Sequence, residues 1–305
     1  MRGRGGRHSE ACLVVVLMGL AAAATGCKDS TKKKPAAVAD ELVPVAPVRQ
    51  AYEAEQVIID DVVLRVSDDS PGYELYPKQL AQHVGRQLAE SGYFFALPNQ
   101  ADPMRPSRRA RISVSVDYSR VPEGSAGKPS LLAAVEATVT WVDGSTPFLK
   151  ENLLGERITE SVPEAELALV AAAHVARIVE EACVGLIAQE RLRTGPSRQI
   201  VETLGGQGTS PNLLRFALKQ LAPRRIAGAV ELAARHLGSK HPEVRHVAVS
   251  TLVELGDPAG VDALTKAASF DDHESMRVVV EAVAVLGGQD AIDYLDFVAS
   301  GHPDD

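Results

Sequence analysis

Residues 123–128, Glu-Gly-Ser-Ala-Gly-Lys, contain glycines and a lysine of the kind that bind phosphate. In a phosphate-binding loop the backbone N–H groups and the lysine hold the phosphates, and a following Ser or Thr holds magnesium. Here the glycine spacing differs from that pattern, and Pro129 follows the lysine. The segment also joins two predicted strands, whereas a phosphate-binding loop opens a helix. We therefore predict a hairpin loop here.

Three histidines, His236, His241 and His246, are spaced five residues apart and raise the question of a metal site. Imidazoles bind one metal ion when they lie three or four residues apart on a helix, or when a loop brings them together. A spacing of five turns successive side chains by roughly 140° on a helix. Pro242 interrupts the helix as well, so we expect surface histidines at the edges of helices.

Neighbouring aspartates occur at residues 60–61, 68–69 and 271–272. Adjacent residues on a strand point to opposite faces, and none of these pairs belongs to a glycine-centred loop of alternating oxygen ligands. We interpret them as solvated turns. The nucleophile pattern Gly-x-Ser-x-Gly does not occur in the sequence. The sequence therefore predicts no catalytic residue, no metal ligand and no cofactor.

The composition indicates globular domains with an acidic surface. The 305 residues carry a formal net charge of −8, and only 4% are aromatic, so the cores are built from Ala, Val and Leu. This acidic balance argues against a nucleic-acid partner, since phosphate binding needs a concentration of Lys and Arg. The basic loop that holds Arg105, Arg108, Arg109 and Arg111 is expected to be a solvated face, with contact to lipid headgroups as the alternative.

The first 26 residues have the pattern of a secretion signal. Three arginines precede an apolar run that starts at Leu13. With roughly a dozen residues, this run is shorter than the ~20 residues that a helix needs to span a bilayer.

The end of this segment, Ala24-Thr25-Gly26-Cys27, resembles the lipobox of bacterial lipoproteins. The resemblance implies cleavage between Gly26 and Cys27 and acylation of Cys27, which then anchors the protein to a membrane. An ordinary secretory signal with a chance cysteine is the alternative. With Cys27 blocked and Cys12 removed, only Cys183 remains free, and it lies in an apolar helical pattern that predicts a buried, unreactive thiol.

Residues 27–50 are rich in Lys, Pro, Ala and Val without a period, and we interpret them as the lipidated cysteine and a flexible tether. Residues 51–194 then predict an α+β domain. Strands are expected at 56–66, 112–119, 131–142 and 148–159, and helices at 77–91 and 163–192. The order β-α-β-β-β-α favours a mostly antiparallel sheet with helices on one face.

The last part, residues 195–305, contains an internal repeat. Residues 241–270 carry Val244-Arg245, Ala248, Leu252, then Leu255-Gly256-Asp257-Pro258-Ala259, Val261 and Leu264, and a second unit begins near Met276-Arg277. A fainter unit precedes them at Leu214-Arg215. This pattern resembles HEAT repeats of the short type found in phycobilisome lyases, and the resemblance implies an α-helical stack.

Two or three such units form a marginal core, because each unit buries its apolar face only against a neighbour. We therefore expect an additional wall from helix 163–192 or from a short helix near residues 198–204.

These patterns favour a non-enzymatic interaction protein, anchored by lipid on the periplasmic face of the inner or outer membrane of a bacterial cell envelope. The HEAT resemblance implies that the second helix of each unit lines a partner groove, with Arg235, Asp262, Lys266 and Tyr294 exposed toward an envelope protein. Tyr294 is the expected anchor, since aromatic residues concentrate binding energy. The alternative is an enzyme, or a helper similar to chromophore lyases, that uses a pocket between the α+β domain and the repeats.

Overall fold

The computed structural model describes residues 54–67, 76–268 and 273–301, which all belong to one compact unit that begins at Gln50. The predicted signal (1–26) and tether (27–50), with Gly26 and Cys27, lie outside the described residues. The aspartates at 68–69 and 271–272 lie outside them as well.

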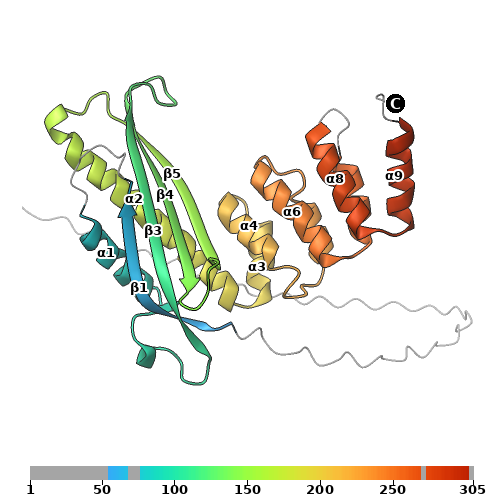
Figure 1. Ribbon diagram of the computed structural model, residues 1–305, viewed down its shortest axis with the longest axis horizontal. Coiled ribbons are helices and arrows are strands. Elements are labelled where there is room, and N and C mark those ends of the chain that lie inside the picture. Colours follow the sequence, from blue (N-terminus) through green and yellow to red (C-terminus); the bar gives the residue numbers. More distant parts are fainter. Residues whose placement is uncertain (1–53, 68–75, 269–272, 302–305) are drawn as a thin grey trace, which may run out of the picture. The chain divides into compact units, whose positions relative to one another are not determined.

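The first half of the described chain is the predicted α+β domain (Figure 1). Its strands are β1 (Gln56–Val66), β2 (Phe94–Phe95), β3 (Ser107–Val121), β4 (Ser130–Trp141) and β5 (Leu149–Ile158), and its helices are α1 (Pro77–Glu90) and α2 (Leu167–Thr194). Short 3-10 turns lie at Pro98–Gln100 and Glu164–Glu166. The predicted strands and helices are all present, whereas the two-residue strand β2 was not predicted because it is too short to show alternation.

The strands form one mixed sheet in the order β2-β1-β3-β4-β5. β3, β4 and β5 form the predicted antiparallel part. β1 instead runs parallel to both of its neighbours, β2 and β3. The reason is the connection: α1 lies between β1 and the next strands and carries the chain back across the sheet, as a parallel pair requires.

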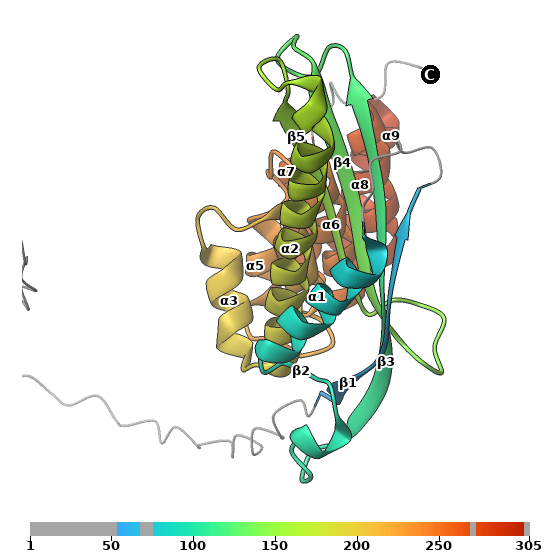
Figure 2. The ribbon, with the colours of Figure 1, turned by 90° about the vertical axis from the view of Figure 1, so that its left-hand side faces the viewer.

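Both helices of the domain cover the same face of the sheet, as predicted, and Figure 2 shows them in front of it. The alternation of β3 places Ile112, Val114 and Val116 on this face, where they are buried against α2 residues such as Ile178 and Leu186. Gly155 on β5 permits the close approach of α2, because a Cβ there would lie 2.3 Å from Ile178 Cδ1.

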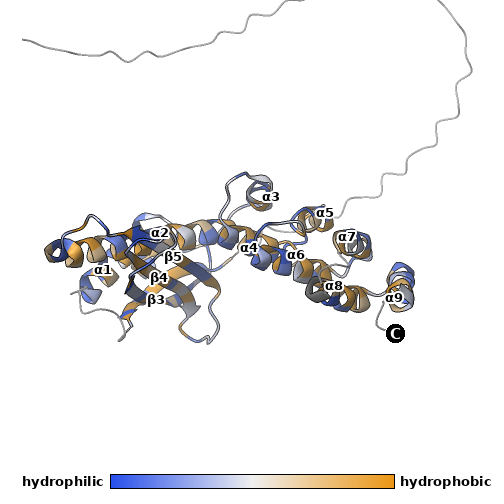
Figure 3. Cartoon of the chain, turned by 90° about the horizontal axis from the view of Figure 1, so that it is seen from above, coloured by the Kyte–Doolittle hydropathy of each residue, from blue (hydrophilic) through white to orange (hydrophobic). Residues whose placement is uncertain are grey.

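The second half of the described chain is a stack of helix pairs. The helices are α3 (Ser197–Gly205), α4 (Pro211–Lys219), α5 (Ala229–Ala234), α6 (Pro242–Leu255), α7 (Ala259–Ala267), α8 (His273–Leu286) and α9 (Gln289–Gly301). The pairs are α4–α5, α6–α7 and α8–α9, and they match the three predicted repeat units. Seen from above, α4, α6 and α8 form one row, and α3, α5 and α7 form the other (Figure 3).

The turn between α6 and α7 has the predicted chemistry. Gly256 ends α6 with φ +63°, a left-handed conformation that glycine adopts without strain. The Asp257 carboxylate then accepts a hydrogen bond from the Ala259 N–H (3.0 Å) and so caps the start of α7. Ser210 caps α4 in the same way, since its hydroxyl accepts from the Leu213 N–H.

The expected wall of the stack is present and is formed by both candidate helices. Leu192 of α2 and Ile200 and Leu204 of α3 belong to the same apolar core as Leu218 and Leu252 of the repeats. Residues of α2 belong to the cores of both halves. The predicted domain boundary between residues 194 and 195 therefore stays a prediction.

Arg224, in the connection between α4 and α5, also donates hydrogen bonds to carbonyl groups at the C-terminal end of α2. The Arg224 guanidinium donates hydrogen bonds to the carbonyl oxygens of Leu192 (3.2 Å), Arg193 (3.0 Å) and Gly195 (2.8 Å). These carbonyls lack partners within the helix, and the C-terminal end of a helix dipole favours a cation. Arg224 therefore ties the repeats to the α+β domain.

Candidate functional site

The second helices of the repeat units, α5, α7 and α9, carry the four residues predicted to bind a partner. Arg235 lies directly after α5 and is exposed. Asp262 and Lys266 are exposed on α7 and form an ion pair with each other, with 2.7 Å between Lys266 Nζ and Asp262 Oδ2. The exposure of these three residues is therefore confirmed, and their binding role stays a prediction.

The fourth residue, Tyr294, is only partly exposed. It is partly buried against the repeat core, and its hydroxyl donates to Met276 Sδ at 3.3 Å. The expected exposure was wrong because the repeat pattern places a tyrosine on the second helix without showing that α8 partly covers it, and the role of Tyr294 as the binding anchor stays a prediction. Tyr294 holds α9 against α8, so its substitution would disturb the fold as well as any interface.

A buried polar cluster joins β5 to the repeats. The Glu151 side chain is 3% exposed, and its carboxylate accepts hydrogen bonds from Gln189 Nε2 (2.7 Å) and Asn212 Nδ2 (2.6 Å). Burial raises the pKa of Glu151 above the usual carboxyl range, and the two donors and Arg215 oppose this shift. The sequence does not reveal this cluster, because its residues come from β5, α2 and α4, which no local pattern brings together.

The same side chains protect the edge of the sheet. Gln189 forms hydrogen bonds with both the N–H and the carbonyl oxygen of Lys150 on β5, and Asn212 donates to the carbonyl oxygen of Asn152. An edge strand presents backbone groups that would otherwise pair with another chain. The polar cluster therefore has a structural role at the junction.

A pocket of about 440 Å³ opens beside this cluster, between the β4–β5 connection and α4. Eleven residues line it: Thr146, Pro147, Phe148, Lys150, Asn152, Gln189, Asn212, Arg215, Phe216, Lys219 and Gln220. Its cations are Lys150, Arg215 and Lys219, and its aromatic wall consists of Phe148 and Phe216. We refer to it as the junction pocket.

Aromatic rings and arginines stack next to the junction pocket. The rings of Trp141 and Phe148 are parallel, with 4.0 Å between centroids, and the Arg193 guanidinium lies 5.6 Å from the Trp141 centroid and 5.3 Å from that of Phe148. Arg193 also forms a bidentate ion pair with Glu190, which is fully buried. This stack fixes the position of Phe148 in the pocket wall.

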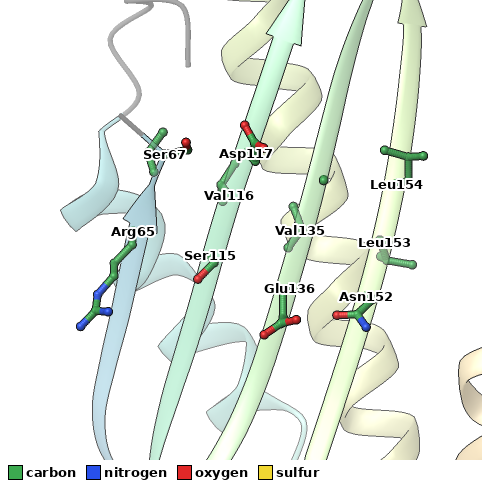
Figure 4. A pocket seen from close by; sticks show the side chains of 12 residues that line it. Arg65, Ser67, Ser115, Val116, Asp117, Val135, Glu136, Asn152, Leu153 and Leu154 are labelled. Atoms are coloured by element: carbon green, nitrogen blue, oxygen red, sulfur yellow. The ribbon is translucent and has the colours of Figure 1, made fainter. Parts of the chain in front are cut away.

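The sheet face opposite the helices is a second candidate surface, seen from close by in Figure 4. It is an open depression of about 710 Å³. The strand register places Arg65, Ser115, Glu136 and Asn152 in one row across the sheet. Such mixed polar residues are typical of a solvated sheet face. The apolar side chain of Leu154 lies on the same surface and is 75% exposed.

The remaining candidates from the sequence have structural roles. Cys183 is fully buried as predicted, and burial raises the pKa of its thiol to about 12, which suppresses the thiolate. Residues 123–128 join β3 to β4, as a hairpin loop does. Asp60 and Asp61 lie within β1, at a shift in its register with β3, so the turn interpretation was wrong for them.

The histidines are only partly on the surface. His246 is exposed, but His236 is half-buried, with its Nε2 3.2 Å from the carbonyl oxygen of Leu204, and burial lowers its pKa. Within the described residues, no three His, Cys, Asp or Glu side chains lie close enough to share a metal ion. None of the described helices combines the length and the apolar character that crossing a bilayer requires.

The comparisons with known proteins identify the helical stack. Residues 199–284 and 226–304 match the family model for HEAT repeats. This segment of the chain consists of HEAT repeats. The match begins in α3 and ends after α9, so it covers the stack and none of the sheet. No curated protein matches the sequence.

Three solved structures share low similarity with this chain. Protein CT253 from Chlamydia trachomatis is 13% identical, with 43% of this chain and 98% of that chain covered and a TM-score of 0.28. A homologue of the neuraminyllactose-binding haemagglutinin from Helicobacter pylori is 9% identical (46% and 90% covered, TM-score 0.28). Protein XCC0632 from Xanthomonas campestris, of the DUF330 family, is 15% identical (47% and 90% covered, TM-score 0.29). Similarity at this level indicates no function.

Proposed function

We propose that this protein is a lipid-anchored scaffold of a bacterial cell envelope, which binds another envelope protein through its HEAT repeats and catalyses no reaction. The observation that carries the proposal is the stack of HEAT repeats, since stacked helix pairs form extended binding surfaces. The exposed positions Arg235, Asp262 and Lys266 on its second helices are the proposed contacts.

The interface is tested by exchanging Asp262 and Lys266, as in the double variant D262K/K266D. The exchange keeps an ion pair four residues apart on α7 and inverts the charge pattern of the surface. It also moves the lysine to the first turn and the aspartate to the last turn, against the helix dipole, at a cost of about 0.5–2 kcal/mol, so the melting temperature of the variant is measured beside its capture of the partner. We expect the variant to lose most of the envelope protein that the wild-type chain captures from a detergent extract.

The matched control is R177E/E181R. Arg177 and Glu181 also form an exposed ion pair four residues apart, but on α2 of the α+β domain. Equal capture by the two exchanged variants and the wild type would contradict the proposed interface.

Membrane anchoring is supported by the lipobox-like sequence that ends at Cys27. Acyl chains on this cysteine would hold the protein at a membrane without a transmembrane helix, provided that two or more chains are attached. Fractionation and intact-mass measurement test this with Cys27→Ala. We expect the wild-type chain to be membrane-bound and to carry fatty-acyl mass on Cys27, and the variant to lack that mass.

The second candidate function is an enzyme or a chromophore-lyase-like helper, and the observation that favours it is the junction pocket between the sheet and α4. A thiol mechanism is disfavoured, because Cys183 is fully buried and its pKa is raised to about 12. Rapid labelling of Cys183 by a thiol reagent in the native protein would favour this second function over the scaffold.

A further inference from the structure

The junction pocket concentrates positive charge in an acidic protein. Lys150, Arg215 and Lys219 line it, and its lining contains no Asp or Glu, whereas the whole chain has a net charge of −8. Cations gathered in a concave site raise the local concentration of anions.

The carboxylates near the pocket leave two of these cations available. Glu136 forms an ion pair with Lys150, with 2.6 Å between Lys150 Nζ and Glu136 Oε2. Glu151 lies behind the lining and accepts hydrogen bonds from Gln189 and Asn212, and it interacts with Arg215 through space without an ion pair. Arg215 and Lys219 are therefore the cations that an incoming anion would meet.

Arg215 and Lys219 have little of their hydrogen-bonding capacity satisfied. Arg215 Nη1 makes one long contact with Asn212 Oδ1 (3.4 Å), and its Nε is buried without a partner among the described residues. The remaining hydrogen-bonding capacity of the Arg215 guanidinium is therefore not used by the described residues. Lys219 is exposed and forms no ion pair with any residue that the structure describes.

The other wall of the pocket is apolar and rigid. Phe148 is held by its parallel stacking on Trp141, and Phe216 is partly buried against the cores of both halves. Together with Pro147 they form a surface that suits a flat or apolar group. A volume of about 440 Å³ is within the ~300–1,000 Å³ range of small-molecule sites.

We propose that the junction pocket binds a small organic anion, whose carboxylate or phosphate oxygens bind Arg215 and Lys219 while its apolar body packs on Phe148 and Phe216. The pocket is lined by the sheet domain and by α4, so an occupant bridges the two halves of the protein. Binding stabilises the folded state at this junction by mass action. The inference is independent of the proposed scaffold function.

Trp141 provides a direct readout of the pocket. It is the only tryptophan in the chain and stacks on the pocket residue Phe148. Its fluorescence is recorded while the full chain is titrated with phenyl phosphate, benzoate, inorganic phosphate or benzyl alcohol. We expect a saturable change with phenyl phosphate or benzoate, a weaker one with inorganic phosphate, and none with benzyl alcohol.

The comparison of phenyl phosphate with benzoate identifies which oxyanion the pocket prefers. Failure of both aromatic anions to produce a saturable change would overturn the proposal. An equal response to benzyl alcohol would also overturn it, because the site would then be apolar rather than anion-binding.

Substitutions of the two cations test whether the anion binds at them. We expect Lys219→Glu to weaken binding of the preferred anion about tenfold or more, since a charge-assisted hydrogen bond is lost and a like charge is introduced. Arg215→Gln is expected to act in the same direction. The matched control is Lys240→Glu, which makes the same charge change at an exposed position in the loop before α6.

Binding that is equal in the Lys219 and Lys240 variants would contradict the assignment. Because Lys219 is exposed and unpaired among the described residues, its substitution leaves the fold intact, and the test stands even if the Arg215 variant fails to fold.

Discussion

The α+β domain and the repeats bury their apolar residues in different ways. In the α+β domain one sheet face is closed by α1 and α2, and the core residues of β3 and β4 come from strands far from these helices in sequence. In the repeats each helix pair is buried only by its neighbours, and the outermost pair exposes Val285 (69%), Ile292 (52%) and Phe297 (59%). A closed domain supplies its own stability, whereas an open stack depends on what covers its ends.

α2 connects these two kinds of core. Ile178 and Leu186 belong to the core of the sheet, and Leu192 belongs to the core of the repeats. The α+β domain therefore provides the first wall of the stack, and the repeats are expected to unfold together with it.

The largest expected effect follows from removing the wall. A fragment of residues 208–305 lacks Leu192, Ile200 and Leu204 and exposes the apolar face of α4 that packs against α2 and α3. We expect a broad, weakly cooperative thermal transition by circular dichroism, while residues 51–305 give a sharp one. A sharp transition of the isolated fragment would show that the repeats need no wall.

The second prediction asks whether the two cores unfold as one. Ile112 in the sheet and Leu252 in α6 are both fully buried. Replacing either by Ala should lower the free energy of unfolding by about 2–5 kcal/mol. In urea unfolding followed by Trp141 fluorescence and by circular dichroism, both variants should shift the same single transition. Two separate transitions, each sensitive to one variant, would contradict the coupling through α2.

The third prediction concerns the link made by Arg224. Arg224→Met removes the hydrogen bonds to three carbonyls at the end of α2 and should cost about 2–4 kcal/mol. Arg225→Met, at the next and exposed position, is the matched control and should cost less than about 0.5 kcal/mol. If the two variants melt at the same temperature, Arg224 does not hold the halves together.

The smallest expected effect is a dependence on pH that belongs to the α+β domain. His174 is buried under the sheet, and burial lowers its pKa. The unfolded chain therefore binds a proton more readily than the folded one, so stability is complete above pH ~6.5 and falls as the pH decreases, by at most about 1.4 kcal/mol per pH unit.

His174→Leu should reduce this acid sensitivity in thermal melts between pH ~7.5 and ~5.5. The pKa of His236 in the repeats is also lowered by burial, so part of the sensitivity should remain. An unchanged pH dependence in the variant would assign the effect to other groups.

The sequence allowed the local elements to be predicted more fully than their assembly. The alternation of Ile112 to Tyr118 and the Gly256-Asp257 turn each specify an element through nearby residues, and the structure contains both. The parallel pairing of β1, the Glu151 cluster and the junction pocket depend on contacts between residues far apart in the sequence. Lys150 and Gln189 are 39 positions apart, and Glu151 and Asn212 are 61 positions apart. The periodicity of apolar residues along the chain contains no information about such distant contacts.

The predicted exposure of Tyr294 was wrong for the same reason. Its place on α9 followed from the repeat, but its burial depends on Met276 in the preceding helix. The exposure of Arg235, Asp262 and Lys266, in contrast, was predicted correctly.

Site-specific photocrosslinking in intact cells tests the scaffold claim most directly. The probe is placed at Arg235, Asp262 or Lys266 on the repeats and, for comparison, at Ser115 or Leu154 on the open sheet face, all of which are exposed. The scaffold account predicts crosslinks to one envelope protein from the repeat positions and none to that protein from the sheet positions. Crosslinks from the sheet positions alone, or the absence of any protein crosslink from the repeats, would contradict it.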